Sequence, residues 1–316
     1  MKVIEHLEAA SGPFASFEII PPLRGGSARD LLDVIEDLLP YRPPFIDVTS
    51  HKAEVEYTET ADGFQRKIKR KRPGTLGICA LIQNKYDVDA VPHVLCDGFT
   101  REETEDFLIE LKYLGIDNVV AVRGDAGGER KKVDAGRSEN KFARDLVAQI
   151  HDMNTGQYLE EDLLDAERSD FCVGVGGYPE KHYEAPNLRT DVRHLKEKVD
   201  AGAHYVISQM CFDNDHFFRF EAECRAQGID VPIIPGLKIL TRRGQLRSIP
   251  KNFKVEIPEA LADAVAAAEK GRVSEVGVEW ALAQVRDLFD RGAPAAHFYV
   301  MSSATAACRI LDKLDL

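Results

Sequence analysis

Short apolar segments alternate with longer amphipathic segments from one end of this 316-residue chain to the other. The apolar segments are rich in β-branched residues, as buried strands are, and the segments between them have helical spacing. Repeated strand and helix units of this kind favour an α/β fold with parallel strands. Eight strands are predicted, at Ala15–Ile20, Phe45–Thr49, Ala90–Leu95, Asn118–Val122, Phe171–Val175, His204–Ser208, Val231–Ile234 and Ala296–Val300.

Capping signals mark several of the helices between these strands. Thr100 and Glu103 form a capping box at the start of one helix, and Gly115 suits the left-handed position at its end. Two stretches are longer than a simple strand and helix unit. We expect Ile78–Tyr86 to form an extra strand or turn, and Gly236–Arg272 to hold more than one helix.

Eight parallel strands can form an open sheet or a closed barrel, and their periodicity does not separate the two. The first strand is not followed by the G-x-G-x-x-G pattern that an open dinucleotide-binding sheet carries there. Polar residues instead gather at the predicted carboxyl ends of the strands, which is the catalytic face of a barrel. We therefore predict a single-domain α/β protein, a (β/α)8 TIM barrel over residues 1–316.

The ends of the first six predicted strands supply polar candidates for an active site. Glu18 is the sharpest case, because a carboxylate within an apolar strand is costly unless it is hydrogen-bonded, and desolvation favours its protonated form. It is therefore a candidate general acid, and the alternative is a structurally paired glutamate. The others are Thr49, His93, Arg123, Gly124, Asp125, Tyr178, His182 and Gln209.

These candidates also have structural alternatives. Arg123, Gly124 and Asp125 offer a cation and an anion at the barrel top, but they could equally form an ion pair at a strand end. His93 and His182, each taken alone, are more often structural histidines than ligands. No acidic or cysteine partner lies at metal-binding spacing from them, so no metal is predicted. The six cysteines show no C-x-x-C pair and suggest no zinc site or disulfide framework.

The charge balance excludes some classes of partner. With 41 Lys and Arg against 53 Asp and Glu, the net charge is −12, which disfavours a broad nucleic-acid surface. The basic run Arg66–Arg72 is interpreted as a solvated helix face or loop rather than a polyanion site. No leader-like or membrane-spanning apolar stretch is found, so no membrane partner is expected and the cytoplasm is the expected location.

Several words of the sequence resemble methylenetetrahydrofolate reductases, in the same order and over nearly the whole chain. They are SFEIIPP, DVTSHK, VPHVLC, GIDNVVAVRGD, GYPEKHYEAP, KVDAGAHYVISQMCFD, GIDVPIIPGL and HFYV. The resemblance implies an FAD-containing barrel that reduces 5,10-methylenetetrahydrofolate to 5-methyltetrahydrofolate with NADH or NADPH. One site serves both half-reactions in this family, so the nicotinamide leaves before the folate enters.

The resemblance also implies residue roles. Glu18 matches the general acid that protonates the folate N5, and Asp125 matches a carboxylate near the flavin and the pterin. Gln209 matches a residue that binds the pterin or the nicotinamide carboxamide. The positions that match flavin contacts are Thr49, His93, Arg123, Gly124, Asp125, Ala143, Tyr178, His182, Asp191 and Lys198.

The chain departs from the family at its last strand, where HFYVMSS replaces a word like HFYTLNR and Ser303 stands in place of an arginine. How the nicotinamide or the folate tail is held is thereby left open. The resemblance is to the short bacterial type, which is usually NADH-using and homo-oligomeric, without a regulatory domain. Two alternatives are another flavin barrel, such as a proline dehydrogenase, and a folate-binding subunit that depends on a partner. Glu18 and Gln209 argue against the first, and Glu18 and Asp125 against the second.

Overall fold

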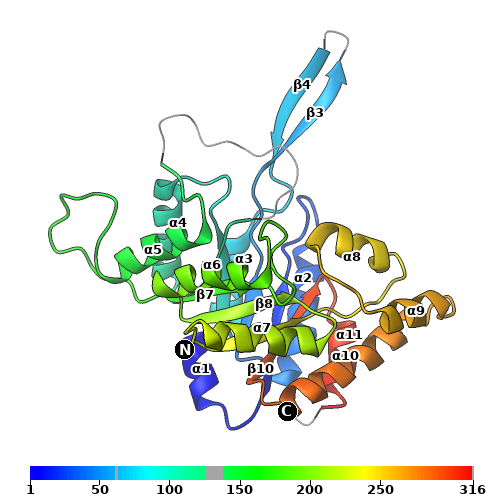
Figure 1. The fold of residues 1–316 in the computed structure, drawn as a ribbon. Helices are drawn as coiled ribbons and strands as arrows, with labels where there is room; N and C mark the ends of the chain where they lie inside the picture. The colour runs from blue at the N-terminus through cyan, green and yellow to red at the C-terminus, as the bar shows by residue number, and fades with distance from the viewer. Residues whose placement is uncertain (61–62, 125–137, 315–316) are drawn as a thin grey trace.

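The computed structural model describes residues 1–60, 63–124 and 138–314. Within these ranges, eight parallel strands close into a barrel in the order β1-β10-β9-β8-β7-β6-β5-β2, which confirms the predicted fold class (Figure 1). The barrel strands are β1 (Phe14–Ile19), β2 (Phe45–Val48), β5 (Asp89–Leu95), β6 (Asn118–Val122), β7 (Cys172–Gly177), β8 (Tyr205–Met210), β9 (Ile233–Leu237) and β10 (Ala295–Met301).

All eight predicted strands are present, with ends that differ from the predictions by a few residues. Helices surround the barrel and connect consecutive strands (Figure 1). They are α1 (Val3–Ala9), α2 (Ala28–Leu38), the 3-10 turn η1 (Leu39–Tyr41), α3 (Thr75–Lys85), α4 (Arg101–Tyr113), α5 (Ala143–Asn154), α6 (Leu188–Asp200), α7 (Asn214–Ala226), α8 (Gln245–Phe253), α9 (Glu259–Ala267), α10 (Val273–Asp290) and α11 (Thr305–Leu311).

The two longer stretches of the chain are both helical. The expected extra strand or turn at Ile78–Tyr86 is wrong, because this stretch belongs to helix α3. Buried Thr75, Cys79 and Ile82 follow helical spacing and pack α3 against the barrel as the crossover between β2 and β5. The prediction of more than one helix within Gly236–Arg272 is confirmed by α8 and α9.

The basic run Arg66–Arg72 is exposed over its first five residues and half-buried at Lys71 and Arg72, and it is not a helix face. Most of it lies in β4 (Gly63–Lys69), which pairs with β3 (Glu54–Thr60) in an antiparallel hairpin that projects from the body of the molecule (Figure 1). Glu56 faces Lys67 across the hairpin, and Lys69 Nζ lies 3.6 Å from Glu56 Oε2. The alternating acidic and basic residues are therefore paired across strands, which helical spacing would not achieve.

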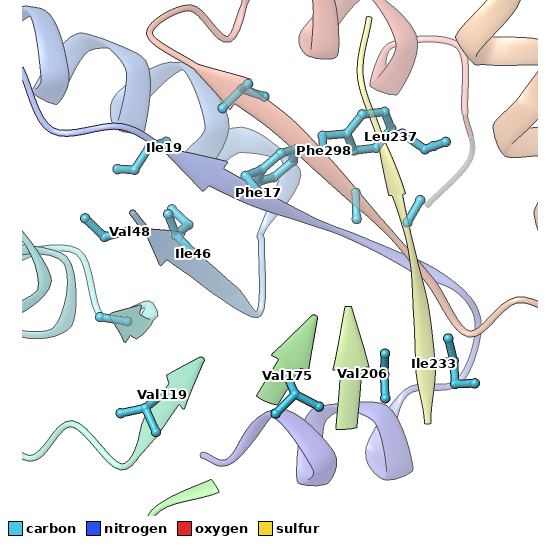
Figure 2. Close-up of a cluster of buried hydrophobic side chains, with 14 of the residues drawn as sticks. Phe17, Ile19, Ile46, Val48, Val119, Val175, Val206, Ile233, Leu237 and Phe298 are labelled. Atoms are coloured by element: carbon cyan, nitrogen blue, oxygen red, sulfur yellow. The ribbon is translucent and has the colours of Figure 1, made fainter. Parts of the chain in front are cut away.

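Side chains that point outward from the strands form the main core with the helices. Figure 2 shows this layer, in which Phe17, Ile46, Phe298 and their neighbours are all but completely buried. Burial of apolar surface in a layer of this size is the dominant stabilising term for the fold.

The interior of the barrel is apolar at its amino-terminal end and polar at its carboxyl end. Phe45 and Val91 belong to a buried inner cluster that Val3 of helix α1 closes from below. Two residues farther along the same strands, the inward positions are occupied by Asp47 and His93. Polar groups therefore gather inside the barrel at the end where the active sites of such barrels lie.

Glycines make room for two tyrosines within the barrel. A Cβ on Gly174 would lie 2.4 Å from Tyr205 Cζ, and one on Gly236 would lie 2.7 Å from Tyr299 Cε2. Both positions therefore require glycine for packing. Gly176 differs, because a Cβ there would meet nothing within 4 Å.

Candidate active site

Two carboxylates and an imidazole meet near the carboxyl end of the barrel interior. Glu18 of β1 and Asp47 of β2 are paired in register, so both point inward. His93 Nε2 lies 3.5 Å from Glu18 Oε2 and 3.4 Å from Asp47 Oδ2. The side chain of Glu18 is 10% exposed and that of Asp47 is 0% exposed, so the pair reaches from the barrel mouth into the sealed interior.

A lysine lies on the other side of Glu18. Lys238 directly follows β9, and its Nζ donates a 2.5 Å hydrogen bond to the carbonyl oxygen of Tyr299. Tyr299 is the residue of β10 that pairs in register with Glu18. Burial lowers the pKa of Lys238 from its ordinary value of 10.5 to about 8, and Glu18 partly offsets that shift.

Neutral polar groups complete this part of the interior. Ser16 Oγ and His297 Nδ1 are 2.9 Å apart, and burial lowers the pKa of His297 to about 4, so its imidazole is neutral at pH 7. The Tyr299 hydroxyl donates to the carbonyl oxygen of Ser208 at 2.7 Å. Burial raises the pKa of Tyr299 well above its ordinary value.

Five predicted site residues line a single cavity beside β6, β7 and β8. They are Arg123, Gly124, Tyr178, His182 and Gln209. The rings of Tyr178 and His182 pack edge to face, with their centroids 4.8 Å apart. Burial lowers the pKa of His182, which favours a neutral imidazole at this position.

Arg123 is ion-paired, but with a residue that the sequence did not suggest. Its Nη2 lies 2.7 Å from Glu184 Oε2, in the loop between β7 and α6. Gly124 has a φ of +107°, and a Cβ there would lie 3.2 Å from Asp97 Cβ, so a glycine fits this turn. Asp125 lies outside the described residues.

Helix α6 supplies two further predicted residues, which contact the β7 backbone and the loop that follows it. Asp191 accepts a 2.8 Å hydrogen bond from the backbone N–H of His182, which fixes the loop that carries Tyr178 and His182. Lys198 Nζ donates to the carbonyl oxygen of Gly176 at 2.5 Å, and burial lowers its pKa to about 8.

Thr49 and Ala143 lie at other edges of the site. The Thr49 hydroxyl follows β2 and is buried without a hydrogen-bond partner among the described residues. Ala143 is the first residue of helix α5, whose amino-terminal N–H groups favour anions. Ser303, at the position where the resemblance led us to expect an arginine, is exposed after β10 and is uncharged.

The expectation that the chain holds no metal stays a prediction. In the described ranges, Glu180, Cys211 and His216 place potential ligand atoms within 4.8 Å of one another. Two of these three groups have another role, however. Glu180 accepts the backbone N–H of Glu256 at 2.6 Å, and the Cys211 thiol donates to the carbonyl oxygen of Asp213.

Sequence reasoning missed Asp47, Lys238 and Tyr299. Asp47 carries the same signal that identified Glu18, a carboxylate within an apolar strand, in the segment PFIDV. Lys238 is likewise surrounded by apolar residues in PGLKIL. Both could have been found by asking which charges interrupt the predicted strands and their ends.

The model for the family described as methylenetetrahydrofolate reductase matches residues 2–315. The chain belongs to this family. The methylenetetrahydrofolate reductase 1 of Schizosaccharomyces pombe is 30% identical over 95% of this chain and 46% of its own length. The 5,10-methylenetetrahydrofolate reductase of Escherichia coli (strain K12) is 29% identical over 95% of this chain and 90% of its own length.

This member of the methylenetetrahydrofolate reductase family spans about half the length of its eukaryotic relatives. The match covers 46% of the fission yeast protein and 44% of the Caenorhabditis elegans protein. It covers most of the bacterial ones. A solved structure from Clostridium thermocellum, of an uncharacterized protein that binds 5-methyl-5,6,7,8-tetrahydrofolic acid, aligns with a TM-score of 0.60. The alignment covers 98% of both chains at 12% identity and supports the fold alone.

None of the helices in the described ranges is long and apolar enough to cross a membrane.

Proposed function

We propose that this chain reduces 5,10-methylenetetrahydrofolate to 5-methyltetrahydrofolate, with FAD as cofactor and NADH or NADPH as hydride source. The observation that carries the proposal is the position of Glu18. Glu18 lies among the polar groups at the carboxyl end of the barrel interior. A cavity at the same end of the barrel is lined by residues that match the family's flavin contacts. Family membership and near-complete coverage of the bacterial reductases support the same activity.

The residues fit a flavin dinucleotide. Thr49 offers a buried hydroxyl with no partner among the described residues, which suits a polar group of a ligand. Gly176 leaves open space above the β7 backbone, where a planar ring could approach. Arg123, Lys198 and the amino terminus of α5 are the donors that a pyrophosphate needs.

When bound, FAD would accept hydride from the nicotinamide and deliver it to the one-carbon unit of the folate. Glu18 would donate a proton to the folate N5 and recover one from solvent at the mouth. Gln209, at the edge of the cavity, would hold the pterin or the nicotinamide carboxamide through its amide. Asp125 is proposed to lie beside the two rings, as the resemblance implies.

Anaerobic spectroscopy of the purified protein tests this proposal. We expect a yellow protein that releases FAD on denaturation, that NADH bleaches, and that methylenetetrahydrofolate then recolours. A protein that stays colourless with added FAD would refute the flavin assignment. Bleaching without folate-driven recovery would instead favour another flavin-barrel oxidoreductase, such as a proline dehydrogenase, or a folate-binding subunit that depends on a partner.

We further propose that the protein is a cytoplasmic homo-oligomer, in keeping with its resemblance to the short bacterial enzymes. Light scattering on the purified holoprotein gives the oligomeric mass directly, and a monomer at micromolar concentration would contradict this expectation.

A further inference from the structure

The most demanding group in the barrel interior is the carboxylate of Asp47. Its side chain is 0% exposed, and neither oxygen has a hydrogen-bond partner among the described residues. Its Oδ2 does lie 3.4 Å from His93 Nε2. A buried carboxylate without a compensating donor or cation is strongly disfavoured, so this contact matters more to Asp47 than an exposed ion pair would.

The same nitrogen atom also serves Glu18. His93 Nε2 lies 3.5 Å from Glu18 Oε2, and Glu18 and Asp47 are direct neighbours across β1 and β2. A ring nitrogen carries at most one hydrogen, so it donates well to only one carboxylate at a time. Glu18 and Asp47 therefore compete for His93.

Burial decides the competition in favour of Asp47. Glu18 is at the mouth with 10% of its side chain exposed, and Lys238 stands on its other side. Asp47 has no solvent contact. When His93 is protonated, its ion pair with Asp47 is close to neutral as a unit, so Glu18 then faces an already compensated cation.

The other titratable neighbours within the described ranges do not change this balance. From β10, His297 is neutral at pH 7 and Tyr299 retains its proton, because burial shifts both pKa values away from the charged form. From β8, burial keeps Tyr205 protonated in the same way, and burial raises the pKa of Cys79 on α3 well above its ordinary value. Among the described residues, Glu18, Asp47, His93 and Lys238 are therefore the ionisable groups on which the balance depends.

We propose that Asp47 is a positioning residue that holds the His93 imidazole to itself and so allows Glu18 to keep the proton that it donates to the folate. The inference rests on the proposed role of Glu18 as general acid. Without the charge of Asp47, His93 turns to Glu18, which then has cations on both sides. An opposite charge at this distance favours the ionised carboxylate by one pH unit or more, about a tenfold change in the protonated fraction.

Infrared difference titration of the apoprotein tests this without turnover. We expect a band from a protonated carboxyl group near neutral pH, and Glu18→Gln should remove it. In Asp47→Asn the midpoint of its titration should fall by about one pH unit or more. In the double variant Asp47→Asn with His93→Gln, the titration midpoint should rise again, because the histidine that would pair with Glu18 is gone. A band that Asp47→Asn abolishes and Glu18→Gln leaves in place would overturn the proposal.

Rapid mixing of the reduced holoprotein with methylenetetrahydrofolate gives the second readout. In Asp47→Asn the reoxidation rate should fall about tenfold at neutral pH and recover as the pH is lowered, while bleaching by NADH keeps its wild-type rate. A pH-independent loss would show a merely structural role and refute the proposal. The matched control is Asp89→Asn, at the other end of the barrel, where Asp89 binds the amino terminus and His6.

The two readouts separate this inference from the proposed function. A wild-type protein that fails to bleach with NADH refutes the proposed flavin chemistry, whereas the infrared titration still reports which carboxyl group holds the proton. An Asp47→Asn protein with the wild-type infrared profile refutes the role of Asp47, whatever the activity.

Discussion

Replacing Lys238 with methionine should make the protein more stable. The pKa of Lys238 falls from its ordinary value of 10.5 to about 8 because burial opposes its charge. A shift of this size corresponds to about 3 kcal/mol of unfavourable free energy in the charged state. Methionine keeps the length and apolar stem of the side chain but leaves the Tyr299 carbonyl without its donor, a loss of about 1 kcal/mol. The expected gain at pH 7 is therefore about 2 kcal/mol.

The pH dependence gives the sharper test. Between pH 8 and 10.5 the folded wild type binds fewer protons at Lys238 than the unfolded chain, so its stability rises with pH in this window relative to the variant. The advantage of Lys238→Met should thus be complete below pH 8 and shrink toward pH 10.5.

Urea unfolding can follow this through the fluorescence of Trp280, the single tryptophan of the chain, whose indole N–H donates to the carbonyl oxygen of Phe212 at 3.0 Å. The exposed Lys251→Met is the matched control and should change the unfolding free energy by less than about 0.5 kcal/mol. A Lys238→Met protein that is less stable than wild type, or whose advantage is the same at pH 7 and pH 10, would refute the reasoning.

Three further expectations concern single positions. Glu18→Gln should slow folate-driven reoxidation by at least about a hundredfold while NADH bleaching stays near wild type, as stopped-flow absorbance would show, and equal loss in both steps would contradict a general acid. Gly277→Ala should destabilise by more than about 3 kcal/mol in urea unfolding, because its Cβ would lie 1.8 Å from the Leu240 carbonyl oxygen, whereas Gly12→Ala has nothing within 4 Å and should unfold like wild type. Thr100→Ala should cost about 1 kcal/mol in the same assay by removing the hydroxyl that accepts the Glu103 N–H, and an unchanged midpoint would count against the capping box.

The sequence predicted the barrel strands well because their signal is local. Each strand is a short, mostly apolar run, and the capping box at Thr100 and Glu103 is present as expected. Helix α3 was missed for the opposite reason. Its apolar run in ICALI suits a buried strand and a buried helix equally, and only its packing as the crossover between β2 and β5 decides between them.

The candidate site was predicted in part. Arg123, Tyr178, His182 and Gln209 share a cavity, as their positions at strand ends suggested. Glu18 and Asp47 approach the same nitrogen of His93, at 3.5 Å and 3.4 Å, because of the strand register. Asp47 and His93 lie 29 and 75 positions after Glu18 in the sequence. No local pattern encodes that register. The partner of Arg123 was also out of reach, because Glu184 comes from a loop whose path the sequence does not specify.

The two inward glycines of β7, Gly174 and Gly176, differ in what restricts their replacement. At Gly174 any larger residue would collide with Tyr205, so drift there is limited by folding itself. At Gly176 a methyl group would meet no atom within 4 Å, so the fold would tolerate it. Such a change would affect only the binding of a ligand in the barrel mouth. A lineage that changed its ligand could therefore begin at Gly176 without first losing its barrel.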